Sequence, residues 1–87
     1  MSTHYERMVA GLDKYARHGV PTGGFLKAVL ANDLAQAVGR ADEESIVELR
    51  DIVRYVYNHL PATCWGSYER VEEWLTIKRA EAKNAEA

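Results

Sequence analysis

The sequence predicts an all-α protein, a small up-down bundle of four helices. Apolar residues recur at helical spacing through most of the chain, and no stretch alternates apolar and polar residues between turn signals as a strand would. Caps and breakers divide the chain into four segments of roughly 14–18 residues. Because short links favour antiparallel neighbours, these segments indicate an up-down arrangement.

The first two helices are defined by their ends. Thr3 and Glu6 fit a capping box at the start of the first helix, and Gly19 followed by Pro21 ends it. The second helix is expected from Thr22 to about residue 38, where Gly39 ends or loosens it. Its predicted inward face is Leu26, Val29, Leu30, Leu34, Ala37 and Val38.

The last two helices are also bounded by caps. Asp42 is a good N-cap for the third helix, which Pro61 stops. The loop 61–67 leads to Ser67, the expected cap of the fourth helix. The inward residues are predicted to be Ile46, Leu49, Ile52, Val53, Val56, Tyr57 and Leu60 on the third helix, and Val71, Trp74 and Leu75 on the fourth. We expect one domain over residues 1–77, followed by a charged tail, 78–87, that frays into solvent.

Composition restricts the class of protein. The chain has 87 residues, of which 47% are apolar and 28% charged, enough for one core. A net charge of −2 argues against a broad nucleic-acid surface, although not against a small anion site. The single cysteine excludes an internal disulfide. With no membrane-length apolar run and no signal sequence, we expect a cytoplasmic protein without membrane contact. We also expect no cofactor.

The up-down topology predicts where the loops meet. The first and third links would share one end of the bundle and bring the N-termini of the second and fourth helices together, where unpaired amides favour an anion. The alternative is that Thr22 and Ser67 are ordinary caps and that the glycine pair serves close helix packing. The predicted ligand-binding residues are Arg17, His18, Thr22, Gly23, Gly24, Lys27, Trp65, Gly66 and Ser67.

Asp33 lies within the predicted apolar stripe of the second helix. A buried carboxylate needs a partner, so we expect Asp33 to be buried and bonded to an Arg or Tyr of the third helix, namely Arg50, Arg54 or Tyr57. Such a pair could be structural. The alternative is a functional carboxylate that faces a pocket or a subunit interface.

Neither a metal site nor a catalytic constellation is predicted. His4, His18 and His59 share no helix at metal-binding spacing. Cys64 is interpreted as a small apolar filler rather than as a nucleophile. Because no Ser-His-Asp arrangement or carboxylate pair can be argued, we expect a protein that is not an enzyme.

Several aromatic residues do not fit an inward stripe. Phe25 and Tyr55 lie away from the apolar faces of their helices, and Trp65 and Tyr68 crowd the last loop. Small proteins do expose some aromatics. The alternative, which we favour, is that Phe25, Tyr55 and Tyr68 form the interface of a homo-oligomer.

Several short motifs resemble a pattern in small all-helical accessory proteins of tailed phages and prophages. They are Pro21-Thr22-Gly23-Gly24-Phe25-Leu26, Ala28-Val29-Leu30, Asn32-Asp33-Leu34, Arg40-Ala41-Asp42, Tyr57-Asn58 with Pro61, and Cys64-Trp65-Gly66-Ser67. The resemblance implies a phage accessory role in the cytoplasm of a bacterial host cell, outside the virion shell. It implies no catalytic residue, since that family has no settled function.

These observations lead to two hypotheses of function. The first is that the protein binds a phosphate-bearing, nucleotide-type ligand at the shared loop end, and so sequesters a host defence signal. The alternative is an interaction module that docks on a host or phage protein through Phe25, Tyr55, Trp65 and Tyr68. A DNA-associated role is disfavoured by the net charge.

Overall fold

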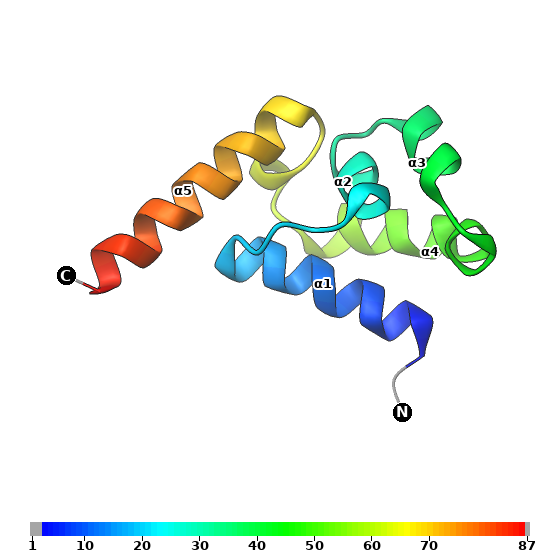
Figure 1. Cartoon of the computed structure of the whole chain (residues 1–87), viewed down its shortest axis with the longest axis horizontal. Coiled ribbons are helices and arrows are strands. Elements are labelled where there is room, and N and C mark those ends of the chain that lie inside the picture. Colours follow the sequence, from blue (N-terminus) through cyan, green and yellow to red (C-terminus); the bar gives the residue numbers. More distant parts are fainter. Residues whose placement is uncertain (1–2, 87) are drawn as a thin grey trace.

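The computed structural model describes residues 3–86 of the chain, without the side chains of residues 85 and 86. Within this range the protein is all-α, as predicted, but it has five α-helices instead of four (Figure 1). They are α1 (His4–His18), α2 (Gly24–Leu30), α3 (Leu34–Arg40), α4 (Glu43–His59) and α5 (Tyr68–Glu86). A single 3₁₀ turn, η1 (Ala62–Cys64), lies between α4 and α5.

The ends of α1, α4 and α5 form as their sequences predict. The Thr3 hydroxyl accepts the Glu6 amide at 3.1 Å, and Gly19 closes α1 at φ 67°. Asp42 accepts the Ser45 amide at 2.7 Å to begin α4. Ser67 accepts the Arg70 amide at 3.1 Å to begin α5. Each cap satisfies an amide that the helix itself leaves unpaired.

The predicted second helix is broken into α2 and α3. Asn32 adopts a left-handed conformation at φ 59°, and the Asp33 carboxylate accepts the Gln36 amide at 3.2 Å to start α3. Asn and Asp tolerate and cap such turns better than most residues, because their short side chains bond nearby backbone groups. The start of the predicted helix also differs: Gly23 is the N-cap, not Thr22, and it makes no side-chain capping bond.

One core holds the helices together. Leu12, Leu30, Ile52, Val56 and Val71 are at most 2% exposed and come from four of the helices. Tyr15 of α1 is also buried, and its hydroxyl donates to the Cys64 carbonyl at 2.7 Å. This bond joins α1 to the turn before α5, across 49 residues of sequence.

The arrangement differs from a bundle of long antiparallel helices. α1 packs along α4, whereas α2 and α3 are short and α5 diverges from α4 (Figure 1). α5 runs without a break through residue 78, the predicted start of the tail, to Glu86. The described part of that tail is therefore helical, and residue 87 lies outside the described residues.

Candidate functional site

The predicted ligand pole is divided among separate parts of the molecule. Gly23 and Gly24 line a hollow with His4 and Asp42, at the starts of α1 and α4. Gly66 lies at the other end of α2, where its amide donates to the Leu30 carbonyl at 2.7 Å. The physical reason is the break at Asn32, since α2 is only seven residues long and cannot cross the molecule.

The remaining predicted ligand residues are also dispersed. Arg17 and His18 are exposed at the end of α1, next to Gly19, which faces Lys78 of α5. Trp65 lines a hollow beneath the turn between α2 and α3. Thr22 is half-buried in the link before α2, and Ser67 is the N-cap of α5.

Two members of the predicted ligand set, Gly24 and Lys27, do line the same hollow. Gly24 and Lys27 of α2, Arg40 of α3 and Tyr68 of α5 line one hollow of about 320 Å³. The Lys27 ammonium also pairs with Glu72 of α5 at 3.3 Å. The Arg40 side chain lies over Gly24, within 2.9 Å of where a Cβ would stand. Two cations thus face a small open hollow.

Asp33 is only partly buried, and its predicted partners are wrong. Besides capping α3, its carboxylate accepts the Tyr68 hydroxyl at 2.7 Å, and this bond is the main reason that the pKa of Tyr68 is raised. Arg50 and Arg54 are exposed, and Tyr57 is 72% exposed. The carboxylate does not need a buried partner, because the broken helix turns it toward the surface.

Two of the three predicted interface aromatics are partly buried against the core. Phe25 is half-buried. Tyr55 is half-buried too, and its hydroxyl donates to Asp13 at 2.6 Å. That hydrogen bond is the largest of the causes that raise the pKa of Tyr55 to about 12, followed by burial. Tyr68 remains 43% exposed.

Several exposed large apolar side chains lie on α3 and α4. We call five of them the α3–α4 face, and these are Leu34, Val38, Ile46, Val53 and Tyr57, which are 42–72% exposed. The sequence pattern assigns all five to the core, and this assignment is wrong for the monomer. Leu34 and Val53 border one hollow. Val38 lies one helical turn after Leu34, and Ile46 and Tyr57 lie at helical spacing before and after Val53.

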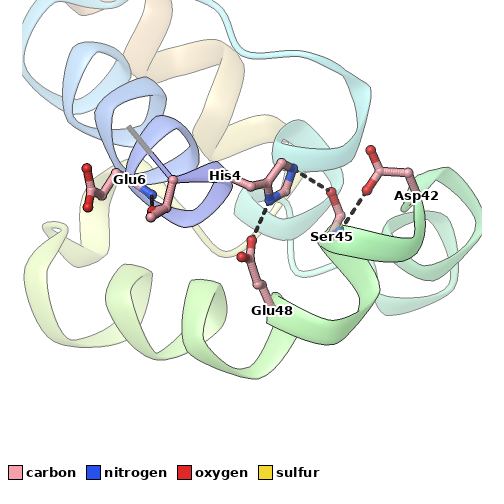
Figure 2. A network of polar contacts seen from close by, with 6 residues as sticks. His4, Glu6, Asp42, Ser45 and Glu48 are labelled. Atoms are coloured by element: carbon pink, nitrogen blue, oxygen red, sulfur yellow. Dashed lines mark hydrogen bonds and ion pairs between the residues drawn. The ribbon is translucent and has the colours of Figure 1, made fainter. Parts of the chain in front are cut away.

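A polar cluster joins the start of α1 to α4 (Figure 2). The His4 Nδ1 pairs with the Glu48 carboxylate, and the His4 Nε2 lies 3.5 Å from the Ser45 hydroxyl. Sequence reasoning missed this cluster because its members lie 41 and 44 residues apart. Only the spacing of Asp42, Ser45 and Glu48 along one side of α4 could have indicated it.

The order hydroxyl, imidazole, carboxylate is that of a catalytic triad, but the geometry favours a structural role. A nucleophile and its base normally lie about 2.6–3.2 Å apart, which is shorter than the distance found here. Ser45 is only 5% exposed, and its amide is bonded to the Asp42 cap. We therefore interpret the cluster as an anchor for the first turn of α1.

The anchor predicts that stability depends on pH. Its hydrogen bond to Glu48 raises the pKa of His4 above 6.5, against the effect of burial, and the charges of Glu48, Glu44 and Asp42 add to the increase. A raised folded-state pKa contributes stability that is fully present below pH 6.5 and is lost as the pH rises through the folded value. Melting curves of the wild type and His4→Gln should therefore differ most at acidic pH and converge at alkaline pH.

Glu48→Gln is the control for this prediction. It removes the carboxylate that raises the pKa of His4, so the melting temperature of Glu48→Gln should depend less on pH between 6 and 8 than that of the wild type. A His4→Gln difference that stays constant across this range would contradict the assigned role of the ion pair.

Cys64 and the histidines are the remaining candidates from the sequence. Cys64 is buried, as predicted, and burial raises the pKa of its thiol to about 11. Among the side chains that the structure describes, those of residues 3–84, no three His, Cys, Asp or Glu are placed to hold a metal ion. No helix within residues 3–86 is long and apolar enough to cross a membrane.

Comparisons with protein-family models, with curated proteins and with solved structures give no significant match. Function is therefore inferred from the surface, and two of its features carry the proposals below: the cationic hollow beside Gly24 and the α3–α4 face.

Proposed function

We propose that the protein is a non-enzymatic interaction module that docks on another protein through the α3–α4 face. As the resemblance to phage accessory proteins implies, its setting would be the cytoplasm of a bacterial host. One observation carries the proposal: five large side chains that fit a core pattern are exposed on adjoining helices. Exposed apolar patches are typical of protein-binding sites, and Leu34 and Val53 of this face line one hollow.

The charge on this face favours a different protein over a second copy. Arg50 is exposed on α4 and lies near the middle of the stripe from Ile46 to Tyr57. Two copies packed antiparallel about a two-fold axis along this stripe would bring their Arg50 side chains together, and juxtaposed like charges oppose association. Self-association, which the sequence led us to expect, is therefore the competing account.

The test is quantitative capture from a lysate of the host bacterium with matched variants as bait. Val53→Glu places a charge in the face, and Leu34→Glu does the same from α3. Val47→Glu is the control, because Val47 is 82% exposed on the same helix but lies about 100° around it from Ile46. We expect one partner that the wild type and Val47→Glu retain and that both face variants lose at least tenfold.

Two results would overturn the proposal. One is a set of captured proteins that does not differ between the face variants and Val47→Glu. The other is a particle larger than 9.8 kDa by light scattering that both face variants convert to the monomer, since the face would then bind a second copy. Circular dichroism verifies that each variant is folded.

A second candidate function is the binding of a phosphate-bearing small ligand in the hollow beside Gly24. The specific observation in its favour is that Lys27 and Arg40 line this hollow with the Tyr68 ring. Cations bind phosphate oxygens, and an aromatic ring can stack on a base. The candidate depends on these side chains, because α2 is too short for its N-terminus to support a site.

Gly24→Ala tests this candidate. The new Cβ would meet Arg40 Nη1 at 2.9 Å, the mobile end of a long side chain, so Arg40 should move away at little cost. Stability should stay the same or rise by up to about 1 kcal/mol, because alanine is the better helix former. A ligand that raises the melting temperature of the wild type should raise that of Gly24→Ala less.

Inorganic phosphate and a panel of nucleotides are the probes for this measurement, which is made by thermal shift. Gly39→Ala is the matched control, since no atom lies within 4 Å of the Cβ position at Gly39. If no probe raises the melting temperature of the wild type, the ligand hypothesis is rejected and the docking module stands alone.

A further inference from the structure

The α3–α4 face contains a hollow suited to one apolar side chain. The hollow has a volume of about 160 Å³ and opens between α2, α3 and α4. A dry cavity of about 150 Å³ can hold a molecule of benzene, so this one has room for a large aliphatic or aromatic group. Its lining is mostly apolar and includes Ala28, Val29, Leu34, Ala37, Val53 and Trp65.

Trp65 lines the hollow and carries a buried donor that has no acceptor among the described residues. The indole Nε1 of Trp65 is buried, and no acceptor among the described residues bonds to it. The Tyr57 ring lies edge-on to the indole with the centroids 6.1 Å apart, and 72% of Tyr57 is exposed. A buried donor without an acceptor is destabilising, so the indole is a weak point in the packing beside the hollow.

Arg50 sets the charge that a partner must carry. Between residues 46 and 57, Arg50 is the only charged side chain on the side of α4 that carries Ile46, Val53 and Tyr57. It makes no ion pair with the described residues. Asp33 borders the same hollow, but its carboxylate is already bonded to Tyr68 and Gln36. The charge open to a partner on this stripe is therefore positive.

We propose that the partner presents an amphipathic helix with one large apolar anchor bordered by acidic side chains. The anchor enters the hollow beside the Trp65 indole, and a carboxylate at the border pairs with Arg50. An apolar helix in a groove, with charge at the border, is a recurrent mode of peptide recognition. This inference rests on the docking function proposed above and adds the chemistry of the partner.

Two synthetic helical peptides test the inference. Both carry the same apolar positions with one Phe anchor, and they differ only in having Glu or Lys at the bordering positions. Each is titrated into the ¹⁵N-labelled full chain, whose two tryptophans give separate indole signals. Trp74 is the internal reference, because its indole already donates to the carbonyls of Tyr15 and Ala16. Trp65→Phe assigns the signals.

We expect the Glu peptide to shift the Trp65 signal, to leave that of Trp74 in place and to bind at least tenfold more tightly than the Lys peptide. Arg50→Glu should reverse this preference. Equal affinity for both peptides, no binding of either at millimolar concentration, or shifts confined to Trp74 would overturn the inference. A captured partner that Val53→Glu loses and Arg50→Glu retains would leave the docking function intact and reject the acidic helix.

Discussion

Tyr15→Ala is expected to lower the free energy of unfolding by about 3–5 kcal/mol, because it removes a large aromatic ring from the core. Tyr15 is 1% exposed, and its hydroxyl donates to the Cys64 carbonyl at 2.7 Å. Its own carbonyl accepts the Trp74 indole at 3.3 Å, so this residue joins α1 to both η1 and α5. Urea melts followed by circular dichroism measure the change.

Tyr15→Phe separates the hydrogen bond from the packing. It keeps the ring and leaves the Cys64 carbonyl without this donor, which should cost about 1–3 kcal/mol. Tyr57→Phe is the control at an exposed hydroxyl and should change the free energy by less than about 0.5 kcal/mol. Equal stability of Tyr15→Phe and the wild type would show that the buried bond contributes nothing.

Gly19→Ala is the second substitution with a large expected effect. Gly19 ends α1 at φ 67°, where a residue with a Cβ loses about 1–2 kcal/mol. The new Cβ would also stand 2.4 Å from the Cβ of Lys78, so α5 would have to shift, and overpacking typically costs about 1–3 kcal/mol. Together these effects predict a loss of about 2–5 kcal/mol in a denaturant melt.

Gly39→Ala again serves as the control. Its φ is not positive and no atom lies within 4 Å of the new Cβ, so its stability should hold or rise by up to about 1 kcal/mol. Equal changes in the free energy of unfolding for Gly19→Ala and Gly39→Ala would show that neither the positive φ of Gly19 nor its close approach to α5 limits stability.

The sequence by itself determined the all-α class and the local boundaries of three helices. Thr3, Asp42 and Ser67 each accept an amide three residues ahead, and Gly19 closes α1. Capping acts within one turn of backbone, so the residues that form each cap are neighbours in the sequence. The burial of Leu12, Ile52 and Val56 likewise follows from helical periodicity.

Only the tertiary structure decided where these elements lie relative to one another. The break at Asn32 separated the predicted ligand pole and turned Asp33 toward Tyr68, a partner 35 residues away. The tertiary structure also leaves Leu34, Val53 and Tyr57 exposed, although their spacing is that of core residues. The physical reason is that helical periodicity identifies the apolar side of a helix but not the surface that covers it. The same pattern results whether that side packs against its own chain or against a partner.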